Sequence, residues 1–234
     1  MGKTDFKVVD LTHSLSSDIP CWDGNCGFHL AMETDYKDCS GPDFFRIQKI
    51  TTLAGTGTHM DAPAHCFSGA KAIDALDLKN LVTDCAVIKV NDVVDENYIV
   101  MPEMVEKFEK ENGKIRPNTF VIIYTGWDKY WNTPEKYRNN LQFPSVHEST
   151  AKLLLERDIA GLGTDTLSAD ATGKSFPVHR AILGAGKYLV ENIANANDLS
   201  STGARIFVMP IKIKEGTEAP IRLVALLDYE QSSS

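Results

Sequence analysis

Apolar runs and helically spaced apolar positions alternate along this chain. Apolar runs that suit strands occupy residues 6–15, 44–53, 85–93 and 119–127. Between the last two runs, residues 98–114 place Met104, Val105 and Phe108 at helical spacing and end in Asn-Gly, which predicts a helix. Residues 145–167 predict a second helix, with Ser149 just before its apolar run, followed by a short strand at 159–165.

The last third of the chain continues this alternation. Residues 176–193 predict a short helix, a Gly-Ala-Gly turn and a strand, and residues 205–213 and 220–227 predict a final β pair. Residues 17–27 read as a turn-rich loop and residues 131–144 as a polar loop with aromatic residues. Without a repeat or a linker, the pattern predicts one α/β domain over residues 1–234, with a mixed sheet flanked by helices.

Composition narrows the classes of partner. The chain has 234 residues, 43% hydrophobic and 24% charged, and a formal net charge of -8 with both signs interspersed. Nucleic acids and anionic membranes need a basic surface, so neither is expected as a partner. No apolar window approaches the length of a membrane span, and the first residues have no apolar segment of a signal peptide.

The cysteines indicate the compartment. Five cysteines without regular spacing predict reduced thiols and a cytoplasmic protein. A small disulfide loop between Cys21 and Cys26 is the alternative for an exported protein.

Candidate chemistry concentrates in the stretch TTLAGTGTHMDAPAHC, residues 51–66. Pro63 excludes a regular helix, and in an extended segment His59 and Asp61, two residues apart, face the same side. An imidazole and a carboxylate on one face suit Zn or Mn. His65 follows beyond Pro63, where the chain can bend back to the same point. The alternative is a loop with two exposed imidazoles and a turn-capping Asp61.

Several segments carry a resemblance to a known family. TGTHMDAPAH resembles the H-x-G-T-H-x-D-x-P-x-H signature of the cyclase family of metal-dependent hydrolases, which includes kynurenine formamidase, isatin hydrolase and trans-dienelactone hydrolase. IPCWDG, GLGTDTLSAD and FVMPIKIKEGTEAPIRLVAL resemble three further segments of that family. FPVHRAILGAGKYLVENI is similar to its late segment, in which a His and a Glu, here His179 and Glu191, stand twelve apart.

The resemblance implies a swivelling β/α/β fold, a homodimer or higher homo-oligomer, and a set of site residues. His59 and Asp61 would ligate a first metal ion, and Asp61 and Glu191 would bridge to a second ion that His179 also holds. His65 would be the general acid/base, and Trp22 in the turn-rich loop would line the substrate pocket.

The sequence departs from this signature at Gly55. The first signature His falls at this position, and glycine cannot ligate a metal. Gln48, Cys66, His29 or water are candidate replacements, and the number of ions, one or two, stays open. Fewer imidazoles, with more carboxylate and water, favour Mn or Mg over Zn.

The resemblance to the family implies hydrolysis of a small amide or lactone, and these residues suit it. A metal-bound hydroxide would attack the carbonyl, and His65 would carry a proton to the leaving group. Arylformamidase, isatin hydrolase and dienelactone hydrolase activities are the candidates, with arylformamidase to be tested first. The alternative is a catalytically weakened family member that serves as a metal or small-molecule binding module because of Gly55.

Other aromatic and charged residues have competing interpretations. Tyr130, Trp131 and Tyr137 could cover an aromatic substrate or form a subunit contact. His13 is expected to be a plain strand histidine rather than a residue that supports the site, and Arg222 a structural ion-pair partner rather than a substrate clamp.

Overall fold

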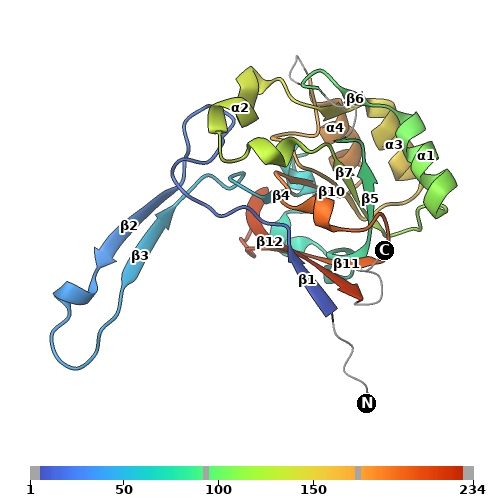
Figure 1. The fold of residues 1–234 in the computed structure, drawn as a ribbon. Helices are drawn as coiled ribbons and strands as arrows, with labels where there is room; N and C mark the ends of the chain where they lie inside the picture. Colours follow the sequence, from blue (N-terminus) through green and yellow to red (C-terminus); the bar gives the residue numbers. More distant parts are fainter. Residues whose placement is uncertain (1–5, 92–94, 172–174, 229–234) are drawn as a thin grey trace.

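The computed structural model describes residues 6–91, 95–171 and 175–228, and its main feature is a mixed sheet that closes on itself (Figure 1). The strands of this sheet are β1 (Phe6–Asp10), β4 (His59–Asp61), β5 (Val82–Lys89), β7 (Phe120–Tyr124), β9 (Gly161–Thr164), β10 (Tyr188–Glu191), β11 (Ala204–Pro210) and β12 (Glu218–Asp228). The strand order is β1-β12-β11-β5-β7-β9-β10-β4, and β4 also pairs with β12. This closure brings β4, the last strand in the order, next to β12, the second strand.

Parallel and antiparallel pairs occupy different parts of this sheet. Strands β5, β7, β9 and β10 are parallel neighbours. Strand β4 is antiparallel to both of its neighbours, β10 and β12. The helices α1 (Pro102–Asn112), α3 (Glu148–Glu156) and α4 (Pro177–Gly184) complete an α/β architecture. The predicted α/β fold class, a mixed sheet flanked by helices, is confirmed.

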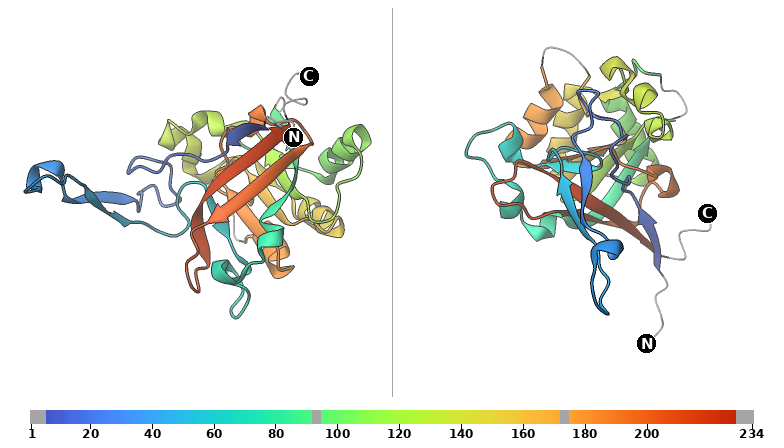
Figure 2. Two further views of the ribbon diagram at one scale, coloured as in Figure 1. Left: turned by 90° about the horizontal axis from the view of Figure 1, so that it is seen from below. Right: turned by 90° about the vertical axis from the view of Figure 1, so that its left-hand side faces the viewer.

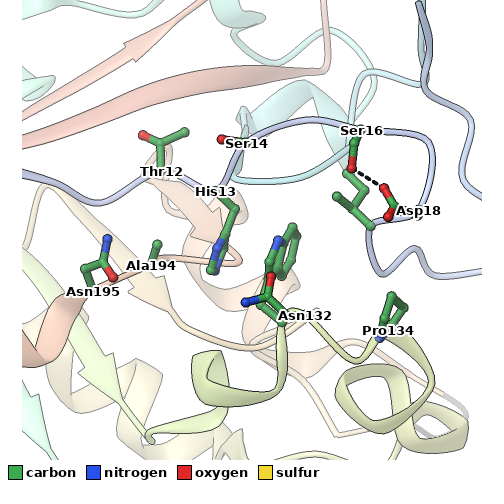
Figure 3. A pocket seen from close by; sticks show the side chains of 11 residues that line it. Thr12, His13, Ser14, Ser16, Asp18, Asn132, Pro134, Ala194 and Asn195 are labelled. Atoms are coloured by element: carbon green, nitrogen blue, oxygen red, sulfur yellow. Dashed lines mark hydrogen bonds between the residues drawn. The ribbon is translucent and has the colours of Figure 1, made fainter.

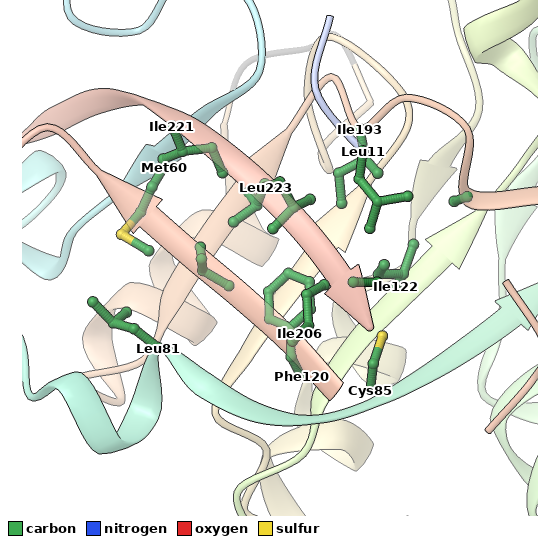
Figure 4. Packing of buried hydrophobic residues seen from close by; sticks show 14 of the residues in the cluster. Leu11, Met60, Leu81, Cys85, Phe120, Ile122, Ile193, Ile206, Ile221 and Leu223 are labelled. Atoms are coloured by element: carbon green, nitrogen blue, oxygen red, sulfur yellow. The ribbon is translucent and has the colours of Figure 1, made fainter. Parts of the chain in front are cut away.

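Two apolar clusters lie on opposite faces of the sheet. Along β7, Phe120 and Ile122 join a cluster inside the closed sheet, while Val121 and Ile123 join a second cluster. This alternation follows from the period of two in a strand. Figure 4 shows the inner cluster, in which Met60 of β4 is fully buried. The second cluster includes side chains of α1, α3 and α4, so these helices cover the outer face of the parallel strands.

A β-hairpin projects from this body. Strands β2 (His29–Thr34) and β3 (Ile47–Thr51) pair only with each other among the described residues and extend away from the closed sheet (Figures 1 and 2). The sequence predicted β3 within 44–53 but not β2. Strands β6 (Ile99–Val100) and β8 (Ser145–Val146) form a second small pair.

The segment predicted as a polar loop at 131–144 is partly helical and partly core, so that prediction was wrong. It contains the short helix α2 (Pro134–Arg138). Tyr137 is fully buried, and Trp131 is buried beside it in an aromatic cluster with Trp127. The apolar aromatic rings, rather than the polar residues between them, decide the packing of this segment. Short 3-10 helices lie at Tyr36–Asp38, Pro63–His65, Ile73–Ala75, Leu78–Asn80, Trp127–Tyr130, Asn139–Leu141 and Ala196–Asp198.

Most other elements are of the predicted type, but several of their ends differ; the helix predicted within 98–114 begins at Pro102, after the strand Ile99–Val100. The first strand stops at Asp10, because the chain then leaves the sheet for a long loop. His147, not Ser149, caps α3: its ring nitrogen accepts the Ser149 backbone N–H at 3.2 Å. Residues 92–94 at the end of the strand predicted at 85–93 lie outside the described residues.

None of the helices in the described part of the chain has the length and apolar character that crossing a bilayer requires. The five cysteines are free thiols. Arg222 forms an ion pair with Asp10 at 2.7 Å, which confirms its predicted structural role.

Candidate metal centre

The short strand β4 places two predicted ligands on one side. His59 and Asp61 are both buried and lie two residues apart, while Met60 between them points into the inner apolar cluster. The Nδ1 of His59 is 2.9 Å from the carbonyl oxygen of Gly57, so Nδ1–H donates and Nε2 keeps its lone pair. The backbone carbonyl thus selects the tautomer that a metal ligand needs.

Pairing of β4 with its two neighbours adds two carboxylates to this side. Glu191 of β10 stands opposite His59, and Glu218 of β12 stands opposite Asp61. Directly paired residues share a face of a sheet. The Nε2 of His59 is 3.6 Å from Glu191 Oε2 and 3.5 Å from Asp61 Oδ1. Closure of the sheet therefore assembles acidic residues from three strands around one imidazole.

The first turn of α4 supplies the second imidazole. The Nε2 of His179 lies 3.4 Å from Asp61 Oδ2 and 3.4 Å from Glu191 Oε1. On its other side, His179 Nδ1 is 2.7 Å from Asp170, whose carboxylate also accepts the backbone N–H groups of Val178 and His179 at 2.8 and 3.0 Å. Asp170 thus fixes the start of the helix and the orientation of the ring together.

Burial and neighbouring charges shift the pKa values of the residues in this cluster in opposite directions. Burial raises the pKa of Glu191 to about 7, despite the charge of His179. Burial lowers the pKa of His179, but Asp170, Asp61 and Glu191 outweigh it and raise that pKa to about 11. Buried carboxylates need a positive partner. A divalent cation satisfies the same requirement, and the imidazoles and carboxylates present are ligands that Zn and Mn accept.

Candidate ligand atoms form two groups that share Asp61. In the first, atoms of His59, Asp61 and Glu218 lie within 4.8 Å of one another, and in the second, atoms of Asp61, His65 and His179 do so. Glu191 is in neither group but lies 3.6 Å from His59 and 3.4 Å from His179, so the predicted residues His59, Asp61, His179 and Glu191 come together. His65 joins them because the 3-10 helix Pro63–His65 turns the chain back.

His65 differs from the other imidazoles in its exposure. About a third of its side chain is exposed (34%), and its Nδ1 is 3.3 Å from Glu218 Oε2. The interaction with Glu218 raises the pKa of His65. A partly exposed imidazole next to buried candidate ligands is accessible to a substrate, which suits transfer of a proton.

An aromatic wall faces these polar groups. His59, Asp61, His65, His179, Glu191 and Glu218 line a cavity of about 280 Å³ together with Trp22 and Phe176. The rings of Trp22 and Phe176 are 6.0 Å apart, and Phe176 is 5.6 Å from the ring of His179. The predicted position of Trp22 in the wall is therefore observed, and the structure adds Phe176. The cavity combines apolar ring surface with convergent polar groups.

A second cavity is lined in part by residues of the chain that precede Trp22, among them Ser14, Ser16 and Ile19. Its volume is about 390 Å³, and residues lining it include Thr12, His13, Asp18, Asn132 and Asn195 (Figure 3). The ring of His13 stacks on Trp131 at 3.9 Å, and burial lowers its pKa to about 4. His13 is thus a neutral packing residue, and this cavity lacks the grouped imidazoles and carboxylates of the first.

Sequence reasoning missed three residues of the site and proposed three replacement ligands that belong to neither group of candidate ligands. His29 and Gln48 are on the exposed hairpin, and Cys66 belongs to neither group of candidate ligands. Glu218, Asp170 and Phe176 were missed. All three stood in segments that resembled the family, but the contacts that bring them to the site depend on the fold.

A family model matches most of the chain. Residues 9–171 match the model of the Cyclase family. An isatin hydrolase from Roseibium aggregatum is 28% identical over 205 residues, which cover 81% of this chain and 78% of that protein. A kynurenine formamidase from Bacillus cereus is 24% identical over 218 residues, 92% of this chain and 95% of that protein.

A solved structure agrees with the fold described above. Isatin hydrolase A from Labrenzia aggregata, bound to benzyl benzoate, superposes with a TM-score of 0.86 at 28% sequence identity. The match covers 95% of this chain and 94% of that one. The resemblance inferred from the sequence motifs thus extends over nearly the whole fold.

Proposed function

The chain belongs to the cyclase family, and from this premise we propose that it is a metal-dependent hydrolase of a small amide whose nitrogen is bonded to an aromatic ring. One observation carries the proposal: a closed sheet and one helix bring His59, Asp61, His179 and Glu191 into a cavity whose other wall is aromatic. A polar reactive centre beside ring surface suits a substrate with both features.

The names of the relatives point to the same substrate class. Isatin is a cyclic amide fused to a benzene ring, and N-formylkynurenine is a formyl amide of an aromatic amine. Both compounds have an amide nitrogen on an aromatic ring. Neither of these relatives is named for a lactone, so we favour C–N over lactone C–O hydrolysis.

The residues present fit a divalent cation, Zn or Mn, as one or two ions. His59, Asp61, His179 and Glu191 would hold it, because each has a ligand atom near the others and His59 and His179 each have Nδ1 bound by another group. When bound, such an ion polarises a carbonyl and lowers the pKa of water.

The chain's own residues supply the remaining functions. Trp22 and Phe176 would stack against the aromatic ring of the substrate and orient its amide toward the polar wall. His65, partly exposed at the cavity, would give a proton to the departing nitrogen. An aromatic amine leaves poorly as an anion, so this proton is worth roughly a hundredfold or more in rate.

The test is an assay of isatin and N-formylkynurenine hydrolysis by protein loaded with Mn or Zn. The loss of each substrate is measured over time. We expect turnover of at least one substrate and a drop of roughly a hundredfold or more in kcat for His65→Ala with metal still bound. His147→Asn is the matched control: it removes an exposed imidazole that does not line the cavity and leaves a residue that caps helices well. Metal-loaded protein that hydrolyses neither compound would contradict the proposal.

Gly55 supports a second candidate, a binding module without catalysis. The motif has lost one imidazole, while the cavity and its aromatic wall are kept. A protein of this kind would bind metal and aromatic amides but release them unchanged. Binding of isatin without turnover, measured on the same metal-loaded sample, distinguishes this candidate from the hydrolase.

We also propose that the protein is a homo-oligomer, and that a second copy covers the β2–β3 hairpin. Leu30 and Ile50 are direct partners on this hairpin and are 52% and 62% exposed, and Met32 shares their face. An isolated two-stranded hairpin is marginally stable in water, and an exposed apolar face of this kind marks an interaction site. The net charge of -8 argues against a nucleic-acid occupant.

Sedimentation equilibrium tests this assembly. We expect a dimer or larger species for the wild type and a shift toward monomer for Leu30→Glu/Ile50→Lys. Leu78→Glu, at an exposed leucine on the body, is the control and should leave the mass unchanged. A monomeric wild type would contradict the proposal.

The odd number and irregular spacing of the cysteines support a cytoplasmic location.

A further inference from the structure

Gly55 occupies its position for space rather than for backbone conformation. Its φ lies outside the left-handed region, in contrast to Gly57 with φ of +66°. A Cβ built at Gly55 would overlap Glu218 Oε1 and would lie 3.4 Å from His59 Nε2. Any side chain at position 55 would therefore displace the Glu218 carboxylate. The volume that a side chain at 55 would need is filled by an acid from another strand.

Glu218 reaches this place through strand pairing. It is the first residue of β12 and stands opposite Asp61, so its side chain emerges on the face that carries the candidate ligands. Its carboxylate, 24% exposed, faces the cavity. Ligand atoms of Glu218, His59 and Asp61 lie within 4.8 Å of one another.

An independent observation shows that this group is incomplete. Asp61 is 2% exposed, and its Oδ1 is a buried oxygen that accepts no hydrogen bond. Its ring neighbour is His59 Nε2 at 3.5 Å, an atom that carries a lone pair in the tautomer set by Gly57. Two electron-pair donors that face each other in a buried place lack a positive partner between them.

We infer that Glu218 replaces the imidazole missing at position 55 and completes, with His59 and Asp61, a binding site for one divalent cation. The inference rests on the proposed function, since it assigns a ligand within the same centre. A carboxylate is a harder donor than an imidazole. The site formed by His59, Asp61 and Glu218 should therefore favour Mn over Zn more than the same site would with an imidazole at position 55.

The test measures metal binding rather than activity. Isothermal titration of metal-free protein with Mn is performed on the wild type, Glu218→Gln and Glu215→Gln. We expect Glu218→Gln to weaken Mn binding tenfold or more, because a neutral amide replaces a charged ligand. Glu215→Gln is the matched control: it removes the same charge from an exposed position three residues away and should bind as the wild type does.

An exchange of positions sharpens the test. Gly55→His alone should bind Mn poorly, because its side chain and Glu218 need the same volume. Gly55→His/Glu218→Gly removes the conflict and should bind metal again, with its preference shifted toward Zn. Circular dichroism of each variant shows whether a loss of binding reflects loss of the fold.

The outcomes separate the two proposals. Mn affinities that are equal in the wild type and folded Glu218→Gln overturn the inference about Glu218 and leave the hydrolase proposal intact. A wild type that binds neither Mn nor Zn refutes the metal-dependent hydrolase itself. Weak binding by Glu218→Gln together with recovery in the exchanged variant supports the inference.

Discussion

Replacement of Asp170 by alanine tests how the second imidazole is held. Asp170 is 1% exposed and accepts three hydrogen bonds, from the backbone N–H groups of Val178 and His179 and from the ring of His179. Alanine leaves these three donors without an acceptor in a buried place. The start of α4 and the orientation of His179 should be lost together.

The magnitude follows from these contacts. Loss of a carboxylate that caps a helix costs about 1 kcal/mol. Loss of a bond between a buried ring and a charged acceptor costs about 2 kcal/mol. Together, Asp170→Ala should lower the free energy of unfolding by about 3 kcal/mol, or the melting temperature by roughly 6–12 °C for a chain of this size. Metal affinity should fall about 10–100-fold, because His179 is no longer oriented.

Urea unfolding followed by circular dichroism measures the first effect, and titration with Mn measures the second. Asp77→Ala is the control, because Asp77 is exposed and its ion pair with Lys79 is long at 3.8 Å; its cost should stay within about 0.5 kcal/mol. The reasoning is refuted if Asp170→Ala unfolds within about 1 kcal/mol of the wild type and binds Mn with unchanged affinity.

Three further predictions concern stability. Tyr137→Phe removes a buried hydroxyl 2.8 Å from the carbonyl oxygen of Asp165 and 2.9 Å from Asn192 Oδ1, and should cost about 1–3 kcal/mol in urea unfolding; an unchanged midpoint would contradict it. Arg157, with Lys114, lowers the pKa of Glu109 from 4.5 to about 2. The ionised Glu109 therefore contributes its full share of the free energy of unfolding above pH 4.5, and this contribution is lost as the pH falls toward 2. Glu109→Gln should therefore lose less stability between pH 5 and pH 3 than the wild type, and equal losses would refute this assignment. Saturating Mn or Zn, at about 100 times Kd, should stabilise the fold by about 2.7 kcal/mol, and a chelator should reverse this in a thermal melt.

The sequence allowed prediction of those parts of the site that depend on local geometry. His59 and Asp61 share a face because they are two residues apart in a strand, and His65 returns to them because Pro63 opens a tight turn. The alternation of elements was also sufficient for the α/β fold class. These features depend on periodicity and on backbone constraints that a few neighbouring residues determine.

Features that depend on contacts distant in sequence could not be predicted. Glu218 meets Asp61 only because β4 pairs with both β10 and β12, and nothing in the residues around Glu218 announces that closure. Tyr137 lies among polar residues, so its burial follows from tertiary packing rather than from local pattern. Strand β2 was also missed; its apolar side chains, such as Leu30, are exposed on the hairpin and do not belong to the core.

Closure of the sheet has a consequence for the order in which the molecule acquires its chemistry. Strand β4 at residues 59–61 must wait for β12 at 218–228 before its second edge is paired. Joining segments so distant in the chain carries a large loop-closure entropy, so this seam should form late in folding. On the ribosome, the cation site that includes Glu218 would stay incomplete until nearly the whole chain has been synthesised. A nascent or truncated chain that lacks β12 would also lack Glu218, so metal binding at the site of His59, Asp61 and Glu218 would report on the final step of folding.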